Sequence, residues 1–199
     1  MKDLFKNALQ DGIDIKLKLQ NQEYSNKFQT IGDLLVKVVK NKKKILFCGN
    51  GGSAADAQHL AAELLVRLRP KINRDPIAAI ALAMDTSTIT ACGNDFGFEK
   101  LFERNVIALG RKGDAIVCIS TSGMSKNLEL ALIAAKSKGL NTIGFLGNDG
   151  GIINKYCENS IIVPSNNTAR IQECHIVLGH ALMEYLEDKL LQANFIKKF

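Results

Sequence analysis

The sequence lacks the features that mark membrane, fibrous and disordered proteins. Its longest near-continuous apolar run, 77–84, is far shorter than the roughly 20 residues of a membrane-spanning helix. No linker, repeat or low-complexity segment divides the 199 residues. Aromatic residues make up only 6%, yet 46% of residues are hydrophobic, which is too many for a disordered chain. We therefore expect one soluble globular domain, residues 1–199, in the cytoplasm, with no membrane partner and no cleaved leader.

The five cysteines are scattered and contain no C-x-x-C pair. An odd number at wide spacing argues against a disulfide framework and against a thiolate zinc site. Buried free thiols are the simpler expectation.

Positive charge gathers in one segment that lacks the residues of a nucleic-acid surface. The net charge is +6, and residues 1–44 hold ten Lys against five acidic residues. The segment has no Arg cluster and few aromatic residues, which is typical of a solvated helical face. We expect no nucleic-acid partner, whereas a small molecule that carries phosphate remains open.

The pattern of apolar residues predicts helices at both ends and a parallel sheet between them. Residues 2–42 have helical periodicity, and a final helical stretch runs from 168 to about 195. Short β-rich runs lie between, at 44–48, 77–82, 115–119, 142–146 and 160–163. These runs lack polar alternation, as expected for strands that helices cover on both faces. The prediction is an α/β three-layer αβα sandwich, with a helical extension (1–43), an α/β core (44–165) and a C-terminal helix (168–196).

The first predicted strand ends in a glycine-rich loop, Gly49–Ala54. Its glycines allow the backbone to approach a phosphate or a sugar at the start of the next helix. The loop also fits the weak dinucleotide pattern G-x-G-x-x-A, but no acidic residue follows at the end of a second strand, so we expect no nucleotide cofactor. An alternative is that Ser53 and Asp56 form only a helix capping box.

A second loop, Ser120–Ser125, follows the strand at 115–119 and precedes a predicted helix at 126–138. Four hydroxyl side chains and one glycine at a helix N-terminus can surround a phosphate with donors. No Lys stands in the Walker position, so hydrolysis of a nucleoside triphosphate is not expected. Ordinary turn and capping chemistry is the alternative.

Two predicted helices carry polar side chains suited to proton transfer or metal binding. His59, Glu63 and Arg67 are spaced i, i+4 and i+8, which places them on nearly one helix face. A histidine and a carboxylate at this spacing can share a metal or act as an acid and a base. The alternative is an exposed face with a Glu63–Arg67 ion pair. In the last helix, Gln172, His175 and His180 interrupt an apolar pattern, a feature also seen at core and interface positions.

Four strings in order resemble one family. They are CGNGGSAADAQHLAAEL at 48–64, GNDFGFE at 93–99, ISTSGMSKN at 119–127 and ARIQECHIVLGH at 169–180. Together they resemble the sedoheptulose 7-phosphate (phosphoheptose) isomerases of the sugar isomerase, or SIS, fold. The resemblance implies a flavodoxin-like fold with a five-stranded parallel sheet and a homotetramer with active sites at subunit interfaces. It further implies conversion of D-sedoheptulose 7-phosphate to D-glycero-D-manno-heptose 7-phosphate, which leads to ADP- or GDP-heptose for lipopolysaccharide and other surface polysaccharides.

The resemblance also assigns roles to individual residues. It implies that Glu63 is the base and His180 the acid of an isomerisation through an enediol. The implied substrate-binding residues are Asn50, Gly51, Gly52, Ser53, Asn94, Asp95, Ser120, Thr121, Ser122 and Ser125. We also expect Arg67 and Gln172 to contact the substrate. The implied zinc ligands, which some members use to polarise the carbonyl, are His59, Glu63, Gln172 and His180. Ala169 replaces an acid found in some members, so no catalytic role is expected there.

One difficulty and two alternatives accompany this reading. Gln172 and His180 are separated by about 12 Å along a continuous helix, so both reach one metal only through long side chains or from different subunits. A related SIS protein that associates with the DnaA replication initiator shares several strings, but it lacks the carboxylate and the imidazole at the positions of Glu63 and His180. Isomerisation of another phosphosugar would keep the chemistry and change the substrate.

Overall fold

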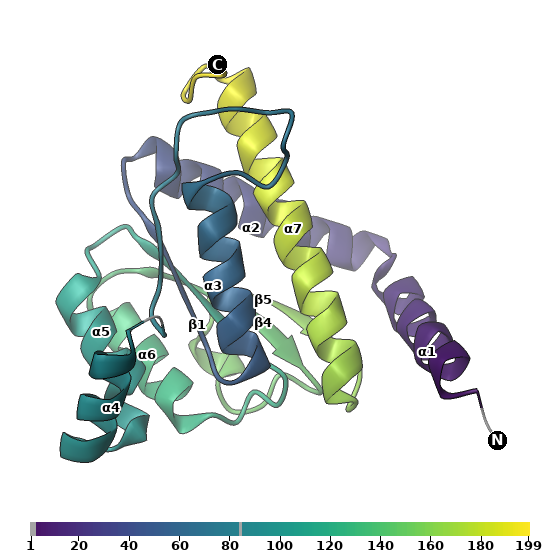
Figure 1. Ribbon diagram of the computed structural model, residues 1–199, viewed down its shortest axis with the longest axis horizontal. Coiled ribbons are helices and arrows are strands. Elements are labelled where there is room, and N and C mark those ends of the chain that lie inside the picture. The colour runs from purple at the N-terminus through teal and green to yellow at the C-terminus, as the bar shows by residue number, and fades with distance from the viewer. Residues whose placement is uncertain (1–2, 84) are drawn as a thin grey trace.

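A five-stranded parallel sheet forms the centre of the computed structural model, which describes residues 3–83 and 85–199 (Figure 1). Met84, at the end of the predicted apolar run 77–84, lies outside the described residues. The strands are β1 (Ile45–Gly49), β2 (Ala79–Ala81), β3 (Ala115–Ser120), β4 (Asn141–Gly147) and β5 (Asn159–Val163). Their spatial order is β2-β1-β3-β4-β5. This order, with right-handed crossovers expected for parallel strands, is that of flavodoxin-like folds.

Helices surround the sheet and extend beyond it. They are α1 (Leu4–Leu19), α2 (Gln22–Lys40), α3 (Gly52–Leu65), α4 (Thr86–Asp95), α5 (Leu101–Leu109), α6 (Lys126–Ser137) and α7 (Thr168–Gln192), with short 3-10 turns at Phe98–Lys100 and Asn154–Tyr156. The described residues contain no helix that is long and apolar enough to cross a membrane.

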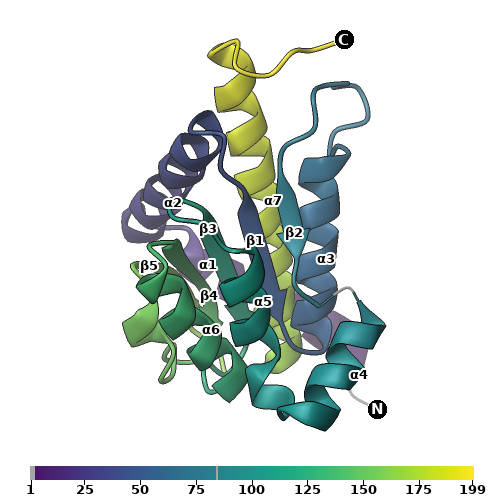
Figure 2. The same cartoon turned by 90° about the vertical axis from the view of Figure 1, so that its left-hand side faces the viewer.

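Both faces of the sheet are buried, which confirms the three-layer prediction. Every residue of β1 and β3 is buried. Phe47 and Phe145 point toward α2, α3 and α7, where Leu35, Leu64 and Leu186 fill one half of the core. Leu46 and Ile116 point the other way, into a second cluster with α5 and α6. Figure 2 shows α5 and α6 on the near side of the sheet and α7 beyond it.

The predicted boundaries differ by one residue at four of the strands, by four residues at the end of the C-terminal helix, and by two residues at the start of β2. This strand spans only Ala79–Ala81, rather than 77–82. The backbone N–H of Ile77 donates to Leu64 O (3.0 Å) and so serves the end of α3 instead of the sheet. The N-terminal periodicity is divided into two helices at Gln20 and Asn21, and α1 points away from the sheet (Figure 1).

Candidate active site

The strand order reverses direction between β1 and β3, and the glycine and hydroxyl loops follow these two strands. In parallel sheets this reversal opens a crevice at the carboxyl ends of the strands. An amide pair joins the two sides of the crevice: Asn50 Nδ2 donates to Asn127 Oδ1 (3.0 Å), and Asn127 Nδ2 donates to Asn50 Oδ1 (2.8 Å). The loop after β1 is therefore fixed to the start of α6.

The glycine loop has a backbone that only small residues allow. Gly51 has φ +55°, and α3 begins directly after it without a side-chain cap. The predicted Ser53–Asp56 capping box is wrong, because the turn at Gly51 places Ser53 inside the first turn of the helix, where it is buried. A Cβ atom on Gly52 would lie 2.4 Å from Gln172 Nε2 of α7. Because Gly52 has no side chain, the Gln172 amide can pack directly against the backbone of the glycine loop.

The hydroxyl loop is folded by its own side chains and braced by glycines. Ser120 Oγ accepts the N–H of Gly123 (3.0 Å), and Ser122 Oγ accepts the N–H of Met124 (3.2 Å). Turn chemistry is thus present, and each hydroxyl still has a proton to donate. Ser125 is the N-cap residue of α6 and makes no side-chain capping bond, and Thr121 is half-buried. The loop consequently offers hydroxyl donors beside the positive end of α6.

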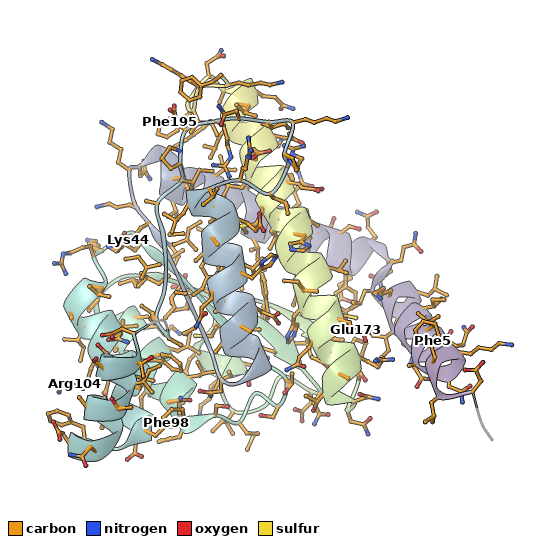
Figure 3. All side chains as sticks on the ribbon, viewed as in Figure 1. Phe5, Lys44, Phe98, Arg104, Glu173 and Phe195 are labelled. Atoms are coloured by element: carbon orange, nitrogen blue, oxygen red, sulfur yellow. The ribbon has the colours of Figure 1, made fainter. Side chains whose placement is uncertain are left out.

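A histidine pair and a carboxylate form the chemical centre between α3 and α7. His59 Nε2 lies 2.8 Å from His180 Nε2 and 3.4 Å from Glu63 Oε1. The Glu63 side chain is 15% exposed and that of His59 is 47% exposed, so the group opens to solvent on the His59 side. Figure 3 shows side chains of α3 and α7 filling the space between these two helices. The structure therefore brings together the predicted base and the predicted acid, and with His59 it brings together three of the four predicted zinc ligands.

Asp56 stands one turn before His59 and was not predicted as part of this group. Its Oδ2 is buried and has no hydrogen-bond partner among the described residues. Burial raises the pKa of Asp56, and the nearby His59 and His180 rings partly oppose this effect. The i, i+3 spacing from His59 was the sequence signal that would have found it. Asn127 was also missed, although it ends the string at 119–127.

Arg67 does not share a helix face with His59 and Glu63. The helix ends at Leu65, and the N–H of Val66 closes its last turn on Ala62 O (2.8 Å). Arg67 is exposed beyond this end. Both the single-face prediction and the alternative Glu63–Arg67 ion pair are therefore wrong, and within residues 3–83 and 85–199 the ionic contact of Glu63 is with His59.

The remaining predicted residues lie at different depths. Asn94 and Asp95 end α4, are exposed, and bond to each other through Asn94 Nδ2 and Asp95 Oδ1 (2.8 Å). His175 is a core residue, because it is 1% exposed and its Nε2 lies 3.1 Å from Leu146 O. Burial lowers the pKa of His175 to about 4.

The side chains at the centre fit zinc in donor chemistry. Two imidazoles and one carboxylate form a common catalytic zinc set. The Nε2–Nε2 distance of 2.8 Å is somewhat shorter than the separation of about 3.3 Å that tetrahedral Zn–N bonds require. In the part of the chain that the structure describes, no group of three His, Cys, Asp or Glu side chains is arranged as a metal cage. Gln172 stands about 12 Å along α7 from His180, beside Gly52.

The fold and the site define an α/β protein with hydroxyl donors at the β1–β3 crevice and a Glu–His group between α3 and α7. The family model of the SIS domain matches residues 11–147. A phosphoheptose isomerase of Clostridium acetobutylicum is 44% identical over 191 residues, 96% of each chain. A solved phosphoheptose isomerase from Neisseria gonorrhoeae is 40% identical, with TM-score 0.86 over 92% of this chain and 97% of that one. One from Francisella tularensis is 33% identical, with TM-score 0.88 over 94% and 97%. The chain therefore belongs to the phosphoheptose isomerase family of SIS domain proteins, and it is an isomerase.

Proposed function

We propose that this site interconverts D-sedoheptulose 7-phosphate and D-glycero-D-manno-heptose 7-phosphate. The observation that carries the proposal is the Glu63–His59–His180 group, with contacts of 3.4 and 2.8 Å between two helices. The names of the relatives support a phosphorylated seven-carbon sugar as the substrate. The product feeds heptose synthesis for lipopolysaccharide and other surface polysaccharides.

The reaction needs one group that moves a proton between carbons and one that serves the oxygens. Glu63 removes a proton from C1 of the ketose, and His180 gives a proton to the C2 oxygen, which yields the enediol. Glu63 then returns its proton to C2, while His180 takes the proton from the C1 hydroxyl and leaves C1 as the aldehyde. Each group ends in its starting state, so the cycle balances.

The hydroxyl loop is the proposed phosphate site. Ser120, Thr121, Ser122 and Ser125 surround the N-terminus of α6, where hydroxyl and N–H donors and the helix dipole favour an anion. The sugar hydroxyls then face the glycine loop, Asn50–Ser53, which the Asn50–Asn127 amide pair fixes to α6. Asn94, Asp95, Arg67 and Gln172 complete the proposed sugar contacts.

Zinc is the proposed cofactor, held by His59, Glu63 and His180, with Gln172 as the fourth ligand. When bound, zinc would polarise the substrate carbonyl. The donor set supports this assignment, and the position of Gln172 favours supply of that ligand from a neighbouring subunit.

A homotetramer is the proposed assembly. The projecting helix α1 exposes an apolar stripe, Leu4, Phe5, Leu9, Ile13 and Leu17. Next to this helix an apolar groove of about 450 Å³ runs between α2, β5 and α7, with Phe28, Val177 and Leu178 in its lining. Exposed apolar area of this kind supports an interface between copies of the chain. We place this assembly in the cytoplasm, in keeping with the five free cysteines.

The test is turnover of sedoheptulose 7-phosphate by purified, metal-analysed protein, with the product followed by NMR. Glu63→Gln and His180→Gln are each expected to reduce kcat at least a thousandfold while the fold stays intact. Glu184→Gln is the matched control, because Glu184 is exposed on α7 one turn after His180. Near-normal turnover in either site variant would overturn the assigned roles, and a pentose or hexosamine phosphate as the preferred substrate would overturn the assigned sugar.

A further inference from the structure

A buried ionic cluster joins α3 to α7 at the end of α3 that lies away from the crevice. Arg74 comes from the loop between α3 and β2, which arches past α7 in Figure 1. Arg74 Nε donates to Glu187 Oε2 of α7 (2.5 Å), and these two side chains are 1% and 2% exposed. Arg69, from the same loop, donates through Nε to the other oxygen, Oε1 (2.6 Å). Both oxygens of this buried carboxylate are therefore held by guanidinium groups.

The same Arg74 side chain also ends α3. Its Nη2 donates to Glu63 O (2.9 Å) and its Nη1 to Leu64 O (3.0 Å). These carbonyls belong to the last turn of the helix, which has no basic residue of its own. A cation at this position completes the C-terminus of the helix and complements its dipole. One planar guanidinium thus binds both helices at once.

The buried cluster is poorly explained by stability alone. Moving charges out of water costs free energy that their attraction only partly recovers, and apolar side chains of similar volume often fill such a site as well. A forked guanidinium differs from an apolar side chain in that it fixes distances and directions. We therefore look for the role of the cluster in the distance and orientation that it fixes between α3 and α7.

The cluster is directly connected to the residues of the site. The carbonyl that Arg74 holds is that of Glu63 itself. Glu187 follows His180 by seven residues, two turns along nearly the same face of α7. Near His180, the helices are close because Gly179 has no side chain, and a Cβ atom there would lie 2.6 Å from Leu60 Cδ2. Gly179 permits the close approach of α3 and α7 beside His180. The Arg74–Glu187 pair fixes the distance between the same two helices two turns further along α7.

We propose that Arg74 and Glu187 are positioning residues for the isomerisation. They set the separation of α3 and α7, and with it the placement of Glu63 relative to His180. Neither side chain touches the reacting groups. This proposal rests on the roles given to Glu63 and His180 under the proposed function.

The test compares Glu187→Gln and Arg74→Lys with Asp114→Asn in the full-length protein. Asp114 is the matched control, because its carboxylate is also 2% exposed and is paired with a lysine, Lys44, directly before β1 and β3 and outside the contact between α3 and α7. At a temperature where all variants are folded by circular dichroism, we expect kcat to fall at least tenfold in the two cluster variants, with KM changed less than threefold. Asp114→Asn is expected to lower the melting temperature and to leave kcat unchanged. Equal kcat in folded Glu187→Gln, Arg74→Lys and wild type would overturn the proposal.

A second readout does not depend on turnover. The chain has only three histidines, so the imidazole NMR signals of His59 and His180 can be assigned by substitution. Both signals should shift in the cluster variants and stay in place in Asp114→Asn. If wild type does not isomerise the sugar but these signals shift, the proposed function fails and the positioning role stands. Unmoved signals would refute the positioning role. If the buried variants do not fold, Arg69→Lys takes their place, because Arg69 is a partly exposed member of the cluster. Unmoved signals in that variant would refute the role in the same way.

Discussion

Gly123 braces the hydroxyl loop against the loop that follows β4. It has φ +65°, and a Cβ atom there would lie 2.0 Å from Gly150 O, which is backbone and has no free rotamer to adopt. The N–H of Ile153 also donates to Gly123 O (3.1 Å). The shape of the proposed phosphate site therefore depends on this single missing side chain.

We predict that Gly123→Ala lowers the free energy of unfolding by about 1–3 kcal/mol and raises KM for the phosphosugar at least tenfold. Denaturant titration and steady-state kinetics measure the two effects. The control is Gly93→Ala in α4, where a new Cβ atom meets nothing within 4 Å. That variant should be neutral or up to about 1 kcal/mol more stable. Unchanged KM in Gly123→Ala would contradict the role of the loop.

His175 makes stability depend on pH. Burial lowers its pKa to about 4, so the folded protein keeps it neutral, whereas the unfolded chain binds a proton below about pH 6.5. Its contribution is fully present above pH 6.5 and is lost as pH falls toward 4. We predict a loss of about 3 kcal/mol from this group across that range. Stability measured against pH should fall less steeply in His175→Gln than in wild type, and equal slopes would contradict the prediction.

At the scale of secondary-structure elements, the packing of α3 against α7 determines where Glu63 and His180 lie relative to each other. Leu60 is completely buried and its Cδ atoms face Gly179, so a methyl group at position 179 has to displace the Leu60 side chain or push the two helices apart. We predict that Gly179→Ala costs about 1–3 kcal/mol of unfolding free energy and lowers kcat. Adding Leu60→Val to this variant removes a methylene at the contact, and it should restore part of the unfolding free energy and part of kcat. A double variant no better than Gly179→Ala would argue against helix spacing as the cause.

Sequence reasoning identified the elements and both loops, but it missed the ends of several elements. Buried strands without polar alternation and the 3–4 spacing of apolar residues carry the fold class, so the sandwich was predictable. The end of α3 was not predictable, because the last carbonyl groups of the helix accept hydrogen bonds from Arg74. Arg74 lies in a loop whose sequence gives no helical signal. Arg67 was therefore placed on a helix that stops before it. The capping box failed for a similar local reason, the positive φ of Gly51.

Within the site, sequence spacing finds neighbours on one helix better than partners on two. The His59–Glu63 contact follows from i, i+4 spacing. The approach of His180, 121 residues later, depends on how α7 packs, and only the family resemblance indicated it in advance. Asp56 could have been found from its i, i+3 spacing to His59, whereas the Arg74–Glu187 cluster carried no indication in the sequence, since buried polar contacts between elements have no periodic pattern.

At the scale of the whole molecule, the exposed apolar side chains of α1 are the surface on which the proposed assembly depends. Leu9 and Ile13 are about half exposed on the side of α1 that does not contact α7. We predict that the double variant Leu9→Lys, Ile13→Lys dissociates the tetramer, as measured by analytical ultracentrifugation, and that turnover per chain falls with it. Asn7→Lys places a single lysine on another side of α1 and should leave the assembly intact. A wild-type protein that sediments as a monomer would contradict the proposed assembly.

The most direct test of the central claim is turnover of D-sedoheptulose 7-phosphate by wild type and by Glu63→Gln, with Glu184→Gln as control and NMR of the product. The Glu63–His59–His180 geometry predicts an aldoheptose 7-phosphate from wild type and from the control, and none from Glu63→Gln. Equal product from Glu63→Gln and wild type would contradict the mechanism. Absence of product from metal-loaded, tetrameric wild type would contradict the assigned substrate.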